Sequence, residues 1–453
     1  MNKKIFRLLL AQLLLLLALT LSGCMASAPV EDLYVLPRLP EEYEDLNAQL
    51  AAIRANGAEQ TSPQGGTNLQ SVQLVDLDGD GDEEAVAFFR DNSEERPLKI
   101  FIFRAVEDSY EQAAIIDGSG TAIRSIRYED MTGDGVKEIL VCWRVSAEVQ
   151  ALGVYALEDM EPMPLMSTAY ARYEVEDLDD DDMKELVVIR NDEGETGVSL
   201  ADYYDWDGGS LLLRSSARLS VAVAELQWTQ TGRLEDGETA VFVTGRETGV
   251  EETSRAITDI LVYREPDLTN IVLDSDTGVS TEIYRFINDL QPADIDGDGV
   301  MEVPMPAQLP VVSAEDGPYW KIYWRSFDAN GQATRRAITY HNIQDSWYLM
   351  IPESWDGHFT VQQNNGSTTE RATTFYSVGG VGVKEELFTI YTLTGPKRKA
   401  QAMQGGRVVL RSKQGTEFAV RFAPAYSDWR YAIDQKEFIK RFNTIVAQWG
   451  GEG

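Results

Sequence analysis

Short apolar runs separated by polar turns dominate the pattern of the chain from Leu69 onward. The runs are four to six residues long, rich in β-branched and aromatic side chains, and bounded by Asp, Gly or other polar residues. This pattern is typical of antiparallel strands joined by tight turns. We therefore expect a mainly β protein with four short strands in each structural unit, the first set of runs being residues 85–89, 98–103, 113–116 and 123–128.

Helical periodicity is restricted to two segments. Residues 40–53 start with Pro and acidic residues and carry apolar residues at helical spacing, and Asn56 and Gly57 follow as a stop signal. Residues 434–446 start with Asp434, which is a typical N-cap, and place apolar residues on one face. We expect a short helix in each segment.

The polar turns contain an internal repeat. Four nine-residue copies align, and they begin at Asp76, Asp130, Asp177 and Asp294. A more divergent copy lies at residues 232–239. The interval of roughly 50 residues between copies accommodates four strands and their turns, which is the size of one β-propeller blade.

Each copy concentrates acidic residues at fixed positions. Positions one, five and nine are acidic in all four copies, position three is acidic in three of them, and position six is usually Gly. Bare carboxylates at this density would repel one another, whereas Ca²⁺ binds six to eight oxygen atoms and accepts irregular geometry. Mg²⁺ requires stricter octahedral geometry, so the pattern favours Ca²⁺ as the cofactor.

The repeat resembles the FG-GAP or VCBS repeats of integrin α-subunits and bacterial surface proteins, over residues 69–340. The resemblance implies a β-propeller with each motif in a turn between adjacent strands, and it implies four metal sites. Their predicted ligands are Asp76, Asp78, Asp80 and Glu84; Asp130, Thr132, Asp134 and Glu138; Asp177, Asp179, Asp181 and Glu185; and Asp294, Asp296, Asp298 and Glu302.

The chain departs from the family pattern at several points. Thr132 supplies only a hydroxyl, so the second site should bind more weakly, and Asp180 and Asp182 replace glycines of the third turn. The family usually ends the motif with Asp, whereas this chain uses Glu. The alternative is that these segments are solvated acidic turns without a bound ion. We expect no ion at the divergent copy.

The first residues are typical of an export signal. Residues 1–23 combine a basic start with a short apolar run, and residues 21–24 read Leu-Ser-Gly-Cys, which resembles a bacterial lipobox. This implies lipidation of Cys24 and a lipid anchor on the extracytoplasmic face of the cell membrane; an ordinary signal peptide with a chance Cys is the alternative. Cys142 then lacks a disulfide partner and is expected to be a buried apolar residue.

We therefore expect four parts: a signal peptide (1–23), a tether with a short helix (24–67), a calcium-binding β-propeller of about five four-stranded blades, with five to seven possible (68–342), and a small α+β domain (343–453). The net charge of −34, from 74 acidic and 40 basic residues, argues against a nucleic-acid partner.

Two functions are consistent with these features. The first is a non-catalytic binding or scaffold lipoprotein whose ligand is a protein or a glycan. The alternative is a carbohydrate-active hydrolase or lyase that uses carboxylates. His341 and His358 are the only histidines, and neither lies in a catalytic or metal motif, so the non-catalytic function is favoured.

Overall fold

The computed structural model describes residues 42–445, except positions 108, 119, 193, 195, 196, 249–253, 313–316, 365 and 380–382. Antiparallel strands form most of this part of the chain, which confirms the expected mainly β class. The strands form six successive sheets, and a two-stranded hairpin, β18 (Leu273–Asp274) with β19 (Val279–Ser280), lies between two of them.

The first three sheets each contain four strands in chain order. They are β2 (Val72–Val75), β3 (Glu84–Arg90), β4 (Leu98–Val106) and β5 (Ser109–Gly118); β6 (Ala122–Glu129), β7 (Glu138–Arg144), β8 (Gln150–Glu158) and β9 (Glu161–Ala169); and β10 (Arg172–Glu176), β11 (Glu185–Asn191), β12 (Ser199–Trp206) and β13 (Leu211–Leu219). The short strand β1 (Glu59–Gln60) also pairs with β3.

The last three sheets depart from this simple order. The fourth and fifth sheets each include a strand from later in the chain, and the sixth does not follow chain order. The fourth has β14 (Leu226–Arg233), β15 (Thr239–Thr248), β16 (Ser254–Arg264) and β17 (Asp267–Asn270), with β20 (Ile283–Arg285) also on β16. The fifth has β21 (Val303–Gln308), β22 (Trp320–Phe327), β23 (Ala333–Asn342), β24 (Trp347–Met350) and β30 (Phe442–Thr444). The sixth is ordered β25 (Phe359–Asn364), β26 (Glu370–Val378), β27 (Lys384–Thr394), β29 (Thr416–Phe422) and β28 (Val408–Lys413).

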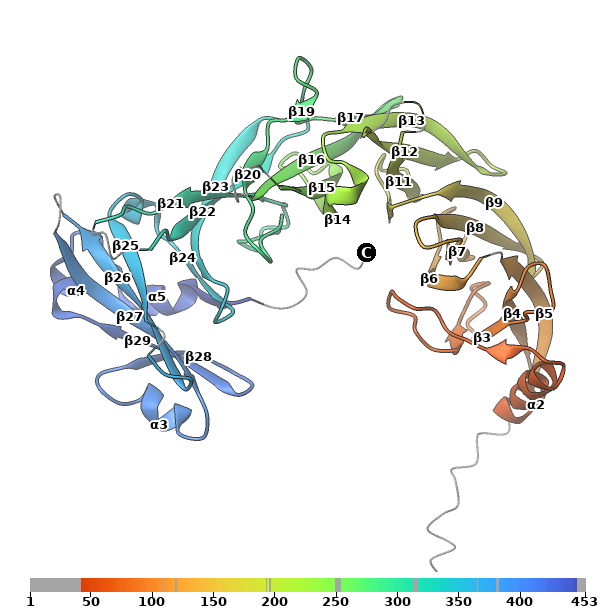
Figure 1. Ribbon diagram of the computed structural model, residues 1–453, viewed down its shortest axis with the longest axis horizontal. Helices are drawn as coiled ribbons and strands as arrows, with labels where there is room; N and C mark the ends of the chain where they lie inside the picture. The colour runs from red at the N-terminus through yellow and green to blue at the C-terminus, as the bar shows by residue number, and fades with distance from the viewer. Residues whose placement is uncertain are drawn as a thin grey trace, which may run out of the picture.

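The sheets follow one another along an arc (Figure 1), with β6 and β14 on its concave side and β5, β9 and β13 on its convex side. Helix α2 (Glu42–Ala55) packs Leu46 and Leu50 onto Phe103 and Tyr110 at the first end of the arc. The helix expected at residues 40–53 is therefore confirmed over most of its length, and it covers the apolar face of the terminal sheet.

Apolar side chains fill the spaces between consecutive sheets. Val86 and Ile100 of the first sheet share a core with Val141 of the second, and Cys142 of the second shares another with Val188 of the third. The second strands β3 and β7 are buried at every position but the last because sheets or a helix cover both their faces. Cys142 is fully buried, as expected for an apolar residue.

The sequence repeat and the sheets are offset by one strand. We expected the four runs within residues 85–128 to form a single sheet, but the fourth run is β6, which begins the second sheet. The first sheet takes β2 instead, which precedes the first acidic motif. That expectation was wrong because each of the first three motifs lies inside a sheet, between its first and second strands, so each of these repeats spans two sheets.

The C-terminal part contains the five strands β25 to β29 and three short helices: α3 (Arg398–Ala402), α4 (Pro424–Asp428) and α5 (Gln435–Arg441). The helix expected at 434–446 begins as predicted, since Asp434 caps it by accepting from the Glu437 amide at 2.8 Å. It ends at Arg441 because β30 pairs with β24 and buries Phe442.

The fifth and sixth sheets share one large core. It joins Tyr340 and Trp347 of the fifth sheet to Phe375 and Phe388 of the sixth, with Phe442 from the end of the chain. The boundary expected between residues 342 and 343 lies between β23 and β24, which pair in one sheet.

Candidate metal centres

Three of the four acidic motifs occupy the same place in their sheets. The first three connect β2 to β3, β6 to β7 and β10 to β11. The fourth, at residues 294–302, leads into β21 and is closed by a bridge between Ala293 and Glu302. Strands flank the first three turns on both sides, as the repeat predicts, and a strand follows the fourth.

The backbone of the motif requires two left-handed residues, at positions four and six. Gly79 and Gly81 have φ values of 76° and 96° in the first turn. Asp180 and Asp182 have φ values of 60° and 70° in the third turn. Asp adopts this region more readily than most residues do, so the third turn keeps the shape of the others without glycine.

Position one organises the turn through backbone amides. The Oδ1 atom of Asp76 accepts from the position-four amide at 2.8 Å, and Asp130 and Asp294 do the same at 2.8 and 2.7 Å. Position five acts locally as well: Asp134 and Asp181 accept from the position-seven amides at 2.9 and 2.8 Å. The acidic side chains therefore build the turn as well as supplying possible ligands.

The glutamate at position nine is buried in all four turns. Glu84, Glu138, Glu185 and Glu302 are between 0% and 2% exposed. In each case the Oε2 atom accepts from the backbone amide of position two, at 2.9, 2.8, 2.7 and 3.0 Å respectively. This hydrogen bond holds the carboxylate underneath the turn and directs it toward positions one and three.

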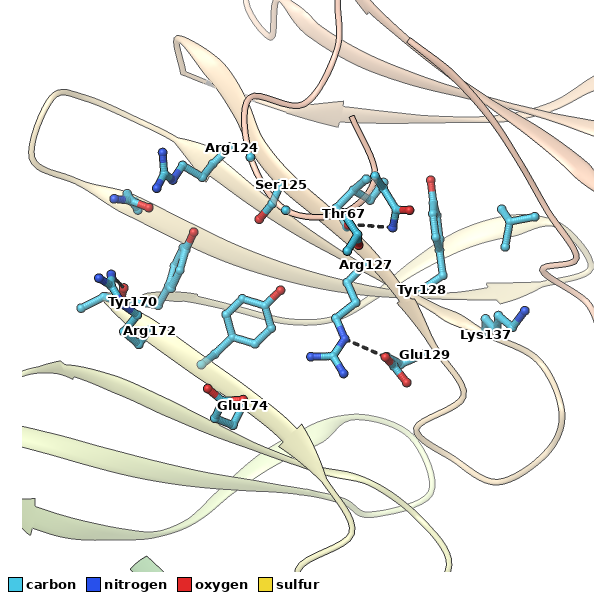
Figure 2. A pocket seen from close by; sticks show the side chains of 18 residues that line it. Thr67, Arg124, Ser125, Arg127, Tyr128, Glu129, Lys137, Tyr170, Arg172 and Glu174 are labelled. Atoms are coloured by element: carbon cyan, nitrogen blue, oxygen red, sulfur yellow. Dashed lines mark hydrogen bonds and ion pairs between the residues drawn. The ribbon is translucent and has the colours of Figure 1, made fainter. Parts of the chain in front are cut away.

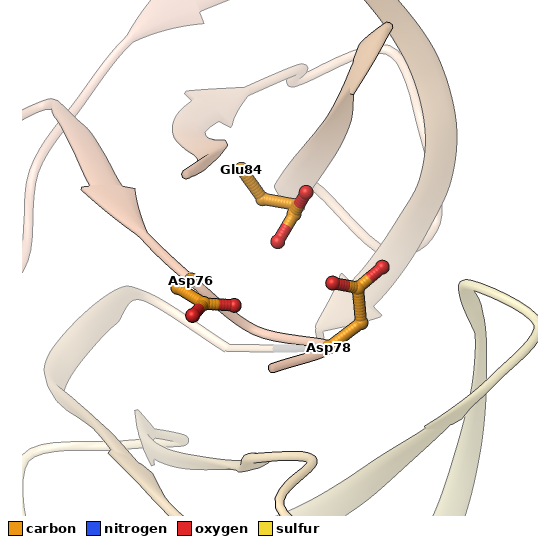
Figure 3. Close-up of side chains that lie close together, drawn as sticks. All are labelled: Asp76, Asp78 and Glu84. Atoms are coloured by element: carbon orange, nitrogen blue, oxygen red, sulfur yellow. The ribbon is translucent and has the colours of Figure 1, made fainter. Parts of the chain in front are cut away.

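Three of the turns bring positions one, three and nine together. One side-chain oxygen of each residue lies within 4.8 Å of the others in the groups Asp76, Asp78 and Glu84; Asp177, Asp179 and Glu185; and Asp294, Asp296 and Glu302. Figure 3 shows the first group facing a common space. The predicted position-five ligands Asp80, Asp181 and Asp298 are outside these groups.

Several of the converging oxygen atoms are buried without a hydrogen-bond partner. They are Oγ1 of Thr132, Oδ1 of Asp177 and Oε1 of Glu302. An unsatisfied buried polar atom costs about 1 to 3 kcal/mol, and a bound cation would satisfy each of them. The orphaned hydroxyl of Thr132 extends this argument to the second turn, where a third acid is missing from the motif.

The position-nine carboxyl groups have raised pKa values. Burial, reinforced by neighbouring Asp residues, raises the pKa of Glu138 to about 7 and those of Glu185 and Glu302 to about 8. Burial also raises the pKa of Glu84. The donors are all oxygen atoms, which suit a hard cation, and such a cation would hold these groups in their charged form.

The turns also contact one another across sheets. The Lys137 amide at position eight of the second turn donates to the Leu77 carbonyl at position two of the first, at 2.8 Å. Lys184 donates to Met131 in the same way at 2.9 Å. The fourth turn repeats this contact, since the Met301 amide donates to the Arg233 carbonyl at 2.9 Å.

The divergent copy forms the turn between β14 and β15. Its acids contact the fifth sheet: Asp236 accepts from the Ala329 amide at 2.9 Å, and Glu235 accepts from the Ser326 hydroxyl. Arg233, which receives the contact from the fourth turn, is position two of this copy. The divergent copy is therefore in register with the other four.

Sequence reasoning missed a cavity of about 580 Å³ on the concave side of the arc. It lies between β6 and β10 and is lined by Arg124, Arg127, Tyr128, Glu129, Tyr170 and Arg172, among others (Figure 2). The sequence does place basic residues on both strands. They were overlooked because the chain as a whole is strongly acidic. No motif marks the cavity.

The two histidines are packed against aromatic rings. His341 is buried, with ring centroids 5.9 Å from Trp324 and 5.0 Å from Tyr348, and burial lowers its pKa to about 3. The ring of His358 stacks on Tyr431 at 4.4 Å. The environment of His341 therefore disfavours a role as a general base near neutral pH.

The predicted signal segment and Cys24 lie outside the described residues. Within the residues that are described, no helix has the length and apolar character needed to cross a membrane. A scan against protein-family models found no match for this chain, and a search of curated proteins likewise found none. The interpretation of the repeats consequently depends on their residues and geometry.

Proposed function

We propose that the protein is a non-catalytic binding or scaffold lipoprotein that is stabilised by calcium. Its lipid anchor on Cys24 would hold it at the extracytoplasmic face of the cell membrane. Its sheets would be successive blades of the FG-GAP or VCBS type, related to those of β-propellers. Three successive sheets whose four strands follow in chain order, each with an acidic turn between its first and second strands, support this assignment.

The buried oxygen atoms under the acidic turns carry the proposal. Solvated acidic turns have no need to bury a glutamate at position nine, and they leave no orphaned oxygen atoms such as those of Thr132 and Glu302. Burying a carboxylate costs several kcal/mol unless a counter-charge accompanies it. Calcium fits because the donors are carboxylate, hydroxyl and carbonyl oxygens on an irregular turn.

The position of the turns supports a scaffold role. The second, third and fourth turns each touch the turn of the preceding copy through a position-eight amide, so an ion bound in one of these turns would fix that turn and its neighbour. Extracellular calcium modules operate at about 10⁻⁴ to 10⁻³ M. The proposed sites would then be filled outside the cell, which agrees with the export signal.

Thermal unfolding with and without metal tests the proposal. A lipid-free form carrying Cys24→Ser should gain melting temperature in millimolar Ca²⁺ relative to chelator, and Mg²⁺ at the same concentration should have a much smaller effect. An equal melting temperature in Ca²⁺ and chelator would refute the calcium role. Loss of the Cys24→Ser protein from the membrane fraction tests the anchor separately.

One observation favours the enzymatic alternative. The cavity contains two carboxyl groups with opposite environments: ion pairing lowers the pKa of Glu129, although burial opposes it, and burial raises the pKa of Glu174. Such a pair is typical of glycoside hydrolases. However, Arg127 and Lys184 bind both oxygens of Glu129 at 2.6 and 2.7 Å, which favours binding over catalysis.

Release of reducing sugar from oligosaccharides decides between the two functions. A hydrolase should lose activity at least 100-fold, on the order of the contribution of one general acid, when Glu174→Gln is introduced. If the unmodified protein releases no sugar from charged and uncharged oligosaccharides, the enzymatic alternative fails and the binding function remains.

A further inference from the structure

The charge of the concave cavity is opposite to that of the chain. The protein has 74 acidic and 40 basic residues, yet four basic and two acidic side chains line this cavity: Arg124, Arg127, Lys137, Arg172, Glu129 and Glu174. A local excess of basic residues in so acidic a molecule concentrates positive potential in one place and would attract an anion there.

The two acidic side chains of the cavity contribute little free negative charge. Glu129 is neutralised by Arg127 and Lys184 at 2.6 and 2.7 Å. Glu174 is half-buried, and burial raises the pKa of its carboxyl group and so favours its neutral form. Arg124 and Arg172 form no ion pair with any described residue. The Nη1 atom of Arg172 donates to the Ala171 carbonyl at 2.9 Å, which leaves its other N–H groups for a ligand.

Flat aromatic surfaces accompany the two arginines. Tyr170 and Tyr173 line the same cavity, with ring centroids 5.7 Å apart in an edge-to-face arrangement. In Figure 2, Tyr170 lies beside Arg172 and faces the same space as Arg124 and Ser125. Guanidinium forks bind carboxylates in two parallel hydrogen bonds, and tyrosine offers both an apolar face and a hydroxyl group.

The walls of the cavity favour a small ligand over an extended peptide. A peptide could add to β6 only if the edge of that strand were free. The edge is already used, because the amides of Gln64 and Gly65 donate to the carbonyls of Ile123 and Arg124 at 3.1 and 2.7 Å. The volume of about 580 Å³ lies within the range of small-molecule pockets.

We propose that this cavity binds the carboxylate of an acidic saccharide, with Arg124 and Arg172 as its ligands and Tyr170 and Tyr173 against the sugar ring. The inference rests on the proposed binding function and names the class of its ligand. A saccharide with one carboxylate per ring is repelled less by the surrounding acidic surface than a polyphosphate would be.

Titration calorimetry on the lipid-free protein in Ca²⁺ tests the proposal. The probe is a disaccharide of glucuronic acid and N-acetylglucosamine, and its methyl ester is the uncharged control. Arg124→Gln and Arg172→Gln should each weaken binding about ten-fold or more, as expected for one charge-assisted pair. Arg214→Gln is the matched control, since Arg214 on β13 pairs with Asp205 on β12 and neither residue lines the cavity.

The outcomes separate this inference from the proposed function. Binding of the acid but not of the ester, with the arginine dependence above, supports the proposal. Equal binding of acid and ester overturns it, and so does binding of an acidic peptide in place of the saccharide. If no saccharide binds while Ca²⁺ still raises the melting temperature, the inference fails and the calcium function stands. If the saccharide binds while Ca²⁺ leaves the melting temperature unchanged, the calcium function fails and the inference stands.

Discussion

The third acidic turn and the divergent turn of the fourth sheet occupy the same place but are stabilised in different ways. In the third turn, Asp177, Asp179 and Glu185 converge within 4.8 Å of one another. In the divergent turn, Glu235 and Asp236 extend to the fifth sheet and accept hydrogen bonds there. The carboxylates of the third turn face one another, whereas those of the divergent turn accept hydrogen bonds from the next sheet.

We infer from the comparison that two ways of placing the acidic side chains can stabilise the junction between two sheets. Converging carboxylates need a cation to offset their repulsion and their burial. Dispersed acids need only the amide and hydroxyl donors that the next sheet supplies. Stability at the third turn should therefore depend on metal, whereas stability at the divergent turn should not.

Removal of a position-nine glutamate should have the largest effect. Glu302→Ala deletes a proposed ligand and leaves the Ile295 amide without its acceptor, so we expect a loss of about 2 to 4 kcal/mol in unfolding free energy in Ca²⁺. Denaturant unfolding in Ca²⁺ and in chelator measures this loss.

Glu302→Gln is the matched control for that substitution. Gln keeps an acceptor for the Ile295 amide but has no charge, so the variant should lose stability in Ca²⁺ and retain or gain stability in chelator. Equal losses for Glu302→Gln in both conditions would show that Glu302 acts only through packing and hydrogen bonding.

Introduction of a carboxylate into the second turn should have the next largest effect. Thr132→Asp supplies the position-three acid that the other turns have, so the calcium affinity of this site should rise on the order of ten-fold, because ligand charge sets the affinity of such sites. Calcium titration followed by calorimetry measures the change. An unchanged affinity would remove position three from the set of ligands.

A substitution in the divergent turn should have a smaller effect that is independent of metal. Asp236→Ala removes the acceptor of the Ala329 amide and should cost about 1 kcal/mol. The loss should be the same in Ca²⁺ and in chelator, as measured by denaturant unfolding. A calcium-dependent loss would mean that the two turns do not differ as proposed.

The sequence predicted strands and acidic turns well because both depend on local signals. Short apolar runs marked β3 and β4, and the nine-residue motif marked its own turns. The pairing of strands could not be predicted in this way. The offset between repeat and sheet follows from β2, a short strand before the first motif, and only its pairing with β3 reveals it.

Long-range contacts account for the remaining differences. The helical pattern after Asp434 continues past Arg441, but pairing with β24 makes a strand of the residues that follow. The basic cavity was missed because Arg124 and Arg172 are far apart in the sequence and belong to different sheets. The acids that converge at positions one, three and nine of three turns were among the predicted ligands, because nine consecutive residues contain them all.

Replacement of the two left-handed aspartates of the third turn should have the smallest effect. Gly relieves the backbone cost at Asp180 and Asp182, whose φ values are 60° and 70°, but it also increases the entropy of the unfolded chain. The double variant Asp180→Gly with Asp182→Gly should therefore change stability by only about 0.5 kcal/mol, and its calcium response should remain intact because neither residue belongs to the converging group. Loss of the calcium-induced rise in melting temperature would place one of these two carboxylates among the ligands and would extend the difference between the third turn and the divergent turn.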